Sequence, residues 1–147
     1  MSKISATITA LGAYVPEHIL SNAMLENMVD TNDEWITART GIKERRILKE
    51  NGKGTSYLAI NAAKDLIKKA ELDPSTIDLV IVATATPDMK AASTASFTAT
   101  AIGACNAFSF DMDSACSGFL FGMSTAASYI ESGRYKKILL IGADKMS

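Results

Sequence analysis

The chain has 147 residues, of which 48% are hydrophobic, and its formal net charge at pH 7 is −1. This length is enough for one domain with its own core, and the near-neutral charge gives no electrostatic reason to expect nucleic acid or an anionic membrane as partner. The two cysteines, Cys105 and Cys116, occur in a chain that does not begin like a signal peptide. We therefore expect a cytoplasmic protein with free thiols.

The first third of the chain predicts one strand and two short helices. Apolar and hydroxyl residues alternate over residues 4–10, which is the pattern of a strand. Ser21 or Asn22 is expected to cap a short helix, and residues 31–34 fit a capping box that opens a second helix over residues 33–40. Gly41 should end this second helix. The apolar side of the first helix consists of Met24, Leu25, Met28 and Val29.

The remainder alternates helices with strands. An amphipathic helix begins at Thr55 or Ser56, and residues 79–84 form a continuous apolar run typical of a strand covered on both faces. A helix over 93–102, a strand over 107–113, a helix from Cys116 to about Ser132 and a strand over 138–141 follow. This order predicts an α/β fold with a mostly parallel sheet and helices on both faces. The apolar face of the amphipathic helix that begins at Thr55 or Ser56 consists of Ala59, Ala62, Ala63, Leu66, Ile67 and Ala70.

Residues 91–130 carry only two charged side chains, Asp111 and Asp113. Ser, Thr, Gly and Asn are too frequent in this stretch for a membrane span, so we expect it to be buried on all sides inside protein. A chain of this length has difficulty covering a helix on every face. The pattern therefore predicts a missing half or a partner, as does the end of the chain just after a buried strand.

Cys116 is the strongest candidate for chemistry. It follows a predicted strand and precedes a predicted helix, so it is expected on a strand-to-helix turn. Free N–H groups and the helix dipole at such a turn favour the thiolate, the form that attacks carbonyl carbon. Small neighbours such as Ser114 and Gly118 leave room for a substrate. By itself, however, the pattern also fits a cysteine that packs as a small hydrophobic residue.

An ordered set of segments resembles β-ketoacyl-acyl-carrier-protein synthase III, and the resemblance runs over essentially the whole chain. The resemblance implies a thiolase-like fold, in which two similar βαβ halves, each with a mostly parallel mixed sheet, enclose the cysteine helix. Residues 1–147 would be the N-terminal half, and the enzyme would be a homodimer. The matching segments are residues 31–36, 39–42, 44–46, 77–88, 93–95, 115–119 and 141–144.

The family's activity implies roles for particular residues. Its members transfer a short acyl group from coenzyme A to the cysteine, here Cys116, and condense it with malonyl-acyl-carrier-protein, with loss of carbon dioxide, to start a fatty acid chain. The backbone N–H of Cys116 would belong to the oxyanion hole. The substrates are thus an acyl-CoA and an acyl carrier protein. The resemblance implies no permanently bound cofactor and no metal.

Four further residues correspond to coenzyme A contacts in the family. Trp35 and Arg39 would sandwich the adenine, and Thr31 and Thr40 would make polar contacts around the same nucleotide. An indole and a guanidinium both stack on a purine. Without the resemblance, Trp35 would equally fit a packing indole, and Arg39 would be read as part of a solvated basic face. Arg45 and Arg46 would meet either an acidic carrier protein or solvent.

The chain also departs from the family pattern. The family's decarboxylating histidine and asparagine lie in its second half; the only histidine here, His18, is expected in a surface loop after Pro16. Ala91 stands where many members have phenylalanine, which predicts a roomier acyl pocket. Cys105 matches no functional position and is interpreted as a packing residue.

Three alternative functions remain open at this point. The chain could be a non-catalytic fragment or a CoA-binding module that needs a companion chain. It could belong to a related polyketide- or quinolone-type condensing enzyme, which shares the fold and the cysteine. An unrelated cysteine hydrolase is much weaker, because no histidine forms a recognisable dyad with the cysteine.

Overall fold

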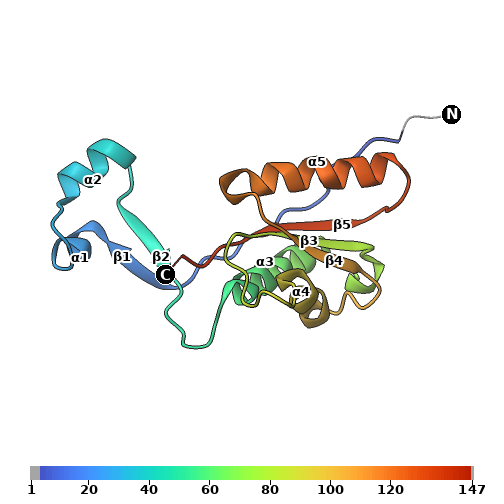
Figure 1. The fold of residues 1–147 in the computed structure, drawn as a ribbon, viewed down its shortest axis with the longest axis horizontal. Coiled ribbons are helices and arrows are strands. Elements are labelled where there is room, and N and C mark those ends of the chain that lie inside the picture. Colours follow the sequence, from blue (N-terminus) through green and yellow to red (C-terminus); the bar gives the residue numbers. More distant parts are fainter. Residues whose placement is uncertain (1–3, 147) are drawn as a thin grey trace. The chain divides into compact units, whose positions relative to one another are not determined.

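The structure is a computed structural model that describes residues 4–146, and it divides into two compact units. Unit 1 comprises the chain up to Tyr14 together with Gly54–Met146, and unit 2 comprises Val15–Lys53. Figure 1 labels the elements of both. Within residues 4–146, no helix is both long enough and apolar enough to cross a membrane.

Unit 1 is built on a three-stranded parallel sheet in the order β4-β3-β5. The central strand β3 (Leu79–Ala83) pairs with β4 (Phe108–Met112) on one side and with β5 (Ile138–Gly142) on the other. All five residues of β3 are buried, as the uninterrupted apolar run predicted. The strand that the sequence marks most clearly is thus the centre of the sheet.

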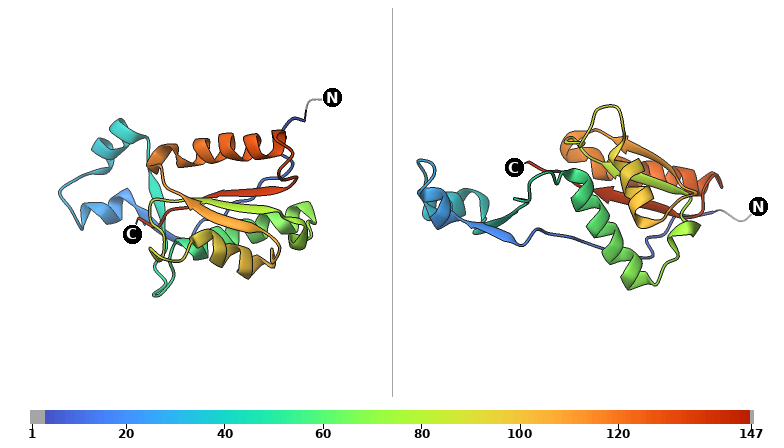
Figure 2. Two further views of the ribbon diagram at one scale, coloured as in Figure 1. Left: turned by 45° about the vertical axis from the view of Figure 1, so that its right-hand side comes forward. Right: turned by 90° about the horizontal axis from the view of Figure 1, so that it is seen from below.

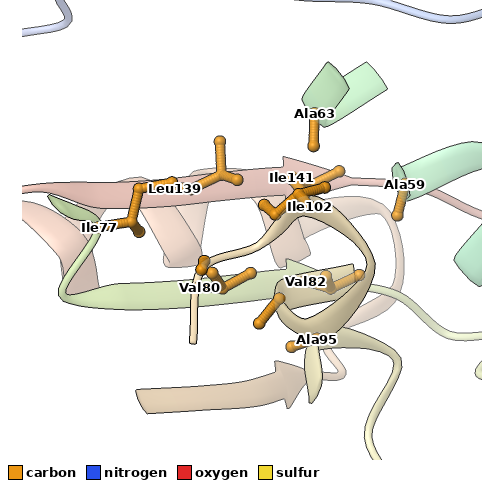
Figure 3. Close-up of a cluster of buried hydrophobic side chains, with 11 residues drawn as sticks. Ala59, Ala63, Ile77, Val80, Val82, Ala95, Ile102, Leu139 and Ile141 are labelled. Atoms are coloured by element: carbon orange, nitrogen blue, oxygen red, sulfur yellow. The ribbon is translucent and has the colours of Figure 1, made fainter. Parts of the chain in front are cut away.

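Helices cover both faces of this sheet. Helices α3 (Thr55–Ala70) and α4 (Thr94–Ile102) lie on one face and α5 (Gly118–Glu131) on the other (Figures 1 and 2). The predicted α/β class with a parallel sheet is confirmed. Two short 3-10 turns, Pro74–Thr76 and Ala115–Ser117, complete the unit. The core lies between the sheet and the α3–α4 layer (Figure 3) and includes Ala59, Ala63, Ile77, Val80, Val82, Ala95, Ile102, Leu139 and Ile141.

The strand predicted at residues 4–10 is wrong. This segment forms no strand, and Ile4 and Ile8 are 51% and 65% exposed. Alternation describes which side chains a strand would turn inward, but a strand also needs a neighbour whose backbone groups pair with its own. The chain is instead held against α3 just after this segment: the Ala13 N–H donates to Asp65 Oδ2 at 2.9 Å, and a Cβ on Gly12 would be 2.5 Å from the Leu66 backbone nitrogen.

Helix α5, which carries no charged residue before Glu131, is not enclosed by the described residues. Only its two glycines, Gly118 and Gly122, are buried, because this face lies against the sheet; a Cβ on Gly122 would be 2.5 Å from Leu140 Cδ1. Residues 4–146 alone therefore do not bury this helix, and its expected cover by a missing half or a partner stays a prediction. Cys105 is also exposed, so it is not a packing residue. The exposed large side chains of α5 are Phe119, Leu120, Phe121, Met123 and Tyr129.

Unit 2 contains a strand pair that the sequence reading missed. Strand β1 (His18–Ser21) runs antiparallel to β2 (Glu44–Ile47), and α1 (Asn22–Glu26) and α2 (Asp33–Thr40) lie between them in the chain. The bounds of α2 and its end at Gly41 (φ 71°) are as predicted. His18 lies in β1, half-buried, with Nε2 enclosed and unpartnered, so its placement in a surface loop is wrong.

Each helix of unit 2 begins directly after a residue whose side chain caps it. Ser21 caps α1 through a bond from the Met24 N–H, as expected, but α1 ends at Glu26, so Met28 and Val29 lie beyond it and are exposed. The cap of α2 is Asn32, whose side chain accepts the Trp35 N–H at 2.7 Å. The predicted Thr31 capping box is wrong, because asparagine is at least as strong a cap as threonine and lies one residue nearer the helix.

Candidate active site

Cys116 lies on the turn that joins β4 to α5. The chain leaves the sheet at Met112, and the Asp113 carboxylate accepts the Ala115 N–H at 3.3 Å. Ala115 then has a φ of 44°, a left-handed conformation that costs a residue with a Cβ of the order of 1 kcal/mol. The strand-to-helix turn expected from the sequence is present, and it includes a strained residue directly before the cysteine.

The turn presents the thiol to solvent at the start of a helical segment. Cys116 is exposed, and the first bonds of the segment run from the N–H groups of Ser117 and Gly118 to the carbonyls of Ser114 and Ala115. The Cys116 N–H lies before both. The first N–H groups of a helix have no partner within it and carry the positive end of its dipole, so this position favours an oxyanion beside the cysteine.

Asp144 joins the carboxyl ends of β3 and β5. Its Oδ1 accepts the hydroxyls of Thr84 and Thr86, each at 3.0 Å, and the backbone N–H of Ala85 at 2.8 Å. Thr55 Oγ1 donates to the Thr86 carbonyl at 2.6 Å, which ties the start of α3 to the same loop. Ligands of open α/β sheets bind at this edge. The contacts of Asp144 fix the loop that follows β3.

A pocket of about 300 Å³ lies beside this loop in unit 1. Asp111 on its wall holds the start of α4, since its two oxygens accept the N–H groups of Thr94 and Ala95, each at 2.7 Å. Ala91 contributes only a methyl group. The pocket is lined by Thr84, Pro87, Met89, Lys90, Ala91, Ala92, Ser93, Asp111 and Asp113.

Trp35 and Arg39 lie one turn apart on α2. The Arg39 guanidinium carbon is 4.7 Å from the centroid of the Trp35 indole, and the indole is 53% exposed. In this arrangement the two groups stack on each other, so no purine fits between them. A purine would stack on the exposed indole or take the place of the guanidinium, which makes this a preformed aromatic and cationic face.

The two threonines differ in what they offer a ligand. Thr40 Oγ1 donates to the Ile36 carbonyl at 2.7 Å and accepts the Ile42 N–H at 3.1 Å, so it already closes the end of α2. Thr31 is half-buried and precedes the capping residue Asn32. All four nucleotide candidates belong to unit 2, whereas Cys116 belongs to unit 1.

The sequence analysis considered Asn22 only as a possible helix cap and missed its role in the structure of unit 2. It is 2% exposed, and its side chain bonds to Asp33, to the Ile42 carbonyl and to Arg45. Arg45 is thus engaged within unit 2 rather than only solvated, and Arg46 donates to the Pro16 carbonyl at 3.0 Å. No local pattern marks an asparagine as buried; only the fold brings these three partners around it.

Comparison with known proteins supports the resemblance. Residues 110–147 match the model of the 3-oxoacyl-[acyl-carrier-protein (ACP)] synthase III family. Over all 147 residues the chain is 58% identical to β-ketoacyl-[acyl-carrier-protein] synthase III 2 of Bacteroides thetaiotaomicron and 54% identical to β-ketoacyl-[acyl-carrier-protein] synthase III of Porphyromonas gingivalis W83. The chain spans about 44% of the length of each of these relatives.

Solved structures agree with this. The 3-oxoacyl-[acyl-carrier-protein] synthase III of Aquifex aeolicus has a TM-score of 0.89 at 45% identity, covering 98% of this chain and 45% of its own. The priming β-ketosynthase of the R1128 polyketide pathway has a TM-score of 0.88 at 34% identity, covering 93% and 41%. The resemblance to β-ketoacyl-acyl-carrier-protein synthase III and the thiolase-like fold are therefore confirmed.

Proposed function

We propose that this chain is the N-terminal thiolase-like domain of an initiating condensing enzyme of type II fatty acid synthesis. The enzyme transfers a short acyl group from acyl-CoA to Cys116 and condenses it with malonyl-acyl-carrier-protein. The observation that carries this proposal is the exposed thiol of Cys116 on the turn into α5, in a chain 58% identical to a named synthase III. We further propose a cytoplasmic homodimer that uses coenzyme A thioesters as substrates and holds no permanent cofactor.

Acyl transfer is the step that this chain's residues explain. The Cys116 thiolate attacks the thioester carbonyl carbon, a new C–S bond forms, and the electrons of the cleaved C–S bond leave on the sulfur of coenzyme A. The Cys116 N–H stabilises the oxyanion of the tetrahedral intermediate. The strained φ of Ala115 sets the direction in which the cysteine leaves the sheet.

Recognition of the nucleotide is assigned to α2. The exposed indole of Trp35 offers a stacking face to adenine, and Arg39 supplies a positive charge beside it. Thr31 and Thr40 complete the face, although Thr40 has only one lone pair left after its two backbone bonds. Thr40 is therefore the weakest of the four contacts.

The decisive experiment measures the intact mass of the chain after incubation with acetyl-CoA. We expect one added acetyl group, its loss in Cys116→Ala, and its retention in Cys105→Ala, a matched control because Cys105 is the other exposed thiol. An adduct that disappears with Cys105 instead would contradict the assignment.

If acetyl-CoA does not acylate Cys116, there are two possible explanations, and a second reagent, iodoacetamide, distinguishes them. If Cys116 forms no acetyl adduct but still reacts with iodoacetamide, the thiol is accessible and the chain alone lacks what thioester transfer needs, which favours a CoA-binding module that requires a companion chain. If Cys116 reacts with neither reagent, its thiol is not accessible on the turn into α5, and the proposed function is contradicted.

A polyketide-type priming activity is the second candidate. It is favoured by the likeness to the R1128 priming β-ketosynthase and by Ala91, whose methyl group leaves the wall of its pocket open. We propose that the primer is larger than acetyl. Comparison of acylation by acetyl-, isobutyryl- and hexanoyl-CoA tests this, since a strict preference for acetyl would contradict it.

A further inference from the structure

Unit 2 has very little apolar core. Of residues 15–53, only Asn22, Ile36 and Leu48 are buried. A segment this short cannot fix the arrangement of two helices and a strand pair by hydrophobic burial alone. Directed polar contacts must therefore supply the geometry that holds α2 beside α1 and the chain that leads into β2.

Asn22 is the centre of these contacts, and we define it with Asp33, Ile42, Lys43 and Arg45 as the Asn22 hub. Its two Nδ2 hydrogens go to Asp33 Oδ1 at 2.7 Å and to the Ile42 carbonyl at 2.8 Å. Its Oδ1 accepts Arg45 Nη1 at 2.6 Å, and its backbone N–H donates to the Lys43 carbonyl at 3.2 Å. The hub thus joins the first residue of α1, both ends of α2 and strand β2.

Only an amide of this length satisfies the hub. Both partners on the Nδ2 side are acceptors and the partner on the Oδ1 side is a donor, so the site needs two hydrogens and one oxygen on one planar group. Because Asn22 is 2% exposed, water does not replace a missing bond without local opening.

The hub acts on the first turn of the helix that carries the candidate nucleotide face. Asp33 opens α2 two residues before Trp35, and its carboxylate also accepts Thr37 Oγ1 at 3.2 Å and pairs with Lys43 at 3.0 Å. Ile42 holds the other end, just past Arg39 and Thr40. Trp35 and Arg39 therefore lie on a helix that is fastened at both ends to one buried amide.

We propose that Asn22 is a positioning residue for coenzyme A recognition, which holds α2 so that Trp35 and Arg39 meet the nucleotide. This inference rests on the proposed function. It goes beyond it by assigning substrate recognition to a buried group that does not touch the substrate.

The test compares two acyl donors that differ only in the nucleotide. The second-order rate of Cys116 acylation is measured by intact mass with acetyl-CoA and with acetyl-pantetheine, which has the same thioester but no adenine nucleotide. Asn22→Asp preserves the shape of the side chain and the bond from Arg45, but it replaces the Nδ2 group, which donates both hydrogen bonds, with an oxygen that only accepts. We expect the rate with acetyl-CoA divided by the rate with acetyl-pantetheine to fall roughly tenfold, which is the scale for losing hydrogen bonds to a charged partner. The rate with acetyl-pantetheine itself should stay unchanged.

A double variant distinguishes a loss of α2 positioning from a general loss of stability. In the double variant Asn22→Asp with Asp33→Asn, a donor again faces an acceptor between α1 and α2, so the ratio should recover in part; the Ile42 carbonyl stays unpaired. Asn27→Asp is the matched control, because it makes the same change in unit 2 at a side chain bonded only to the Ala23 carbonyl. We expect it to leave the ratio unchanged.

The sole tryptophan gives an independent readout. Trp35 emission titrated with coenzyme A should show weaker binding in Asn22→Asp than in Asn27→Asp. If Asn22→Asp does not fold, Asp33→Ala replaces it, since it removes the bond to α2 and leaves those to Ile42 and Arg45. A severalfold drop in the rate ratio is then expected.

The outcomes distinguish this inference from the function on which it rests. An unchanged ratio in a folded hub variant, an equal loss with both donors, or no rescue by the double variant overturns the role of Asn22. If the unaltered chain reacts equally with acetyl-CoA and acetyl-pantetheine, the nucleotide face itself is wrong, and the proposed use of coenzyme A by α2 falls with the inference.

Discussion

Unit 1 and unit 2 achieve a defined structure by different means. Unit 1 surrounds a fully buried strand with two helix layers, and the core cluster drawn in Figure 3 has 11 apolar residues. Unit 2 buries two apolar side chains and one asparagine. The candidate nucleophile therefore stands on a scaffold held by non-directional burial, whereas the candidate nucleotide face depends on directed hydrogen bonds.

The difference has a consequence for function. Apolar packing tolerates changes of sequence that preserve volume, while a polar hub fails when one donor becomes an acceptor. If the proposed roles hold, acylation at Cys116 in unit 1 should survive many substitutions, and the proposed coenzyme A recognition by unit 2 should be sensitive to a few. Four predictions test this comparison.

The largest effect is expected at the buried central strand of unit 1. Ile81→Ala removes a side chain that is 0% exposed at the centre of β3 and should lower the free energy of unfolding by about 3 kcal/mol. Urea unfolding followed by circular dichroism measures it. Ile8→Ala, at a residue 65% exposed, is the control and should cost less than about 0.5 kcal/mol. Equal effects would mean that β3 is not the core.

A smaller effect is expected at the polar edge of unit 1. Asp144→Ala removes the acceptor shared by Thr84, Ala85 and Thr86 and should cost about 1.5 kcal/mol in the same unfolding assay. Asp144→Asn retains an oxygen at this position and should recover most of the loss. If the asparagine variant is as unstable as the alanine variant, charge rather than the hydrogen bonds matters there.

Acid should release the hub of unit 2. The bond from Asn22 and the contact with Lys43 hold the pKa of Asp33 below its ordinary value. A lowered pKa in the folded state means that the stabilisation is present above the ordinary value, about pH 4, and is lost as the pH falls through the lowered value. Trp35 emission should therefore change below about pH 4, and this step should be absent in Asp33→Asn. A step of the same size in that variant would place its origin elsewhere.

The smallest effect is expected at Ala115. Glycine relieves the left-handed φ of 44° but gains freedom in the unfolded chain, so Ala115→Gly should change stability by less than about 1 kcal/mol. Because the turn then holds Cys116 less firmly, acylation by acetyl-CoA should slow while alkylation by iodoacetamide does not. A parallel change in both rates would show that the turn controls exposure rather than direction.

The sequence by itself determined the helices and strands of unit 1 from α3 onward and the location of Cys116 between two of them. The uninterrupted apolar run of β3, the alanine stripe of α3 and the glycine stops after α2 and α4 are local signals, because periodicity and left-handed turns are properties of neighbouring residues. The placement of Cys116 between a strand and a helix followed from the same signals.

Tertiary structure decided what depends on partners distant in the chain. Residues 4–10 alternate like a strand yet pair with none, β1 and β2 pair without a strong pattern, and Asn22 is buried by groups up to 23 residues away. Backbone pairing and burial of a polar group both require a second segment, whose position a local pattern does not encode. The position of Cys116 on a strand-to-helix turn was therefore predictable from one stretch, whereas the arrangement of the candidate nucleotide face was set only when α1, α2 and β2 came together around the Asn22 amide.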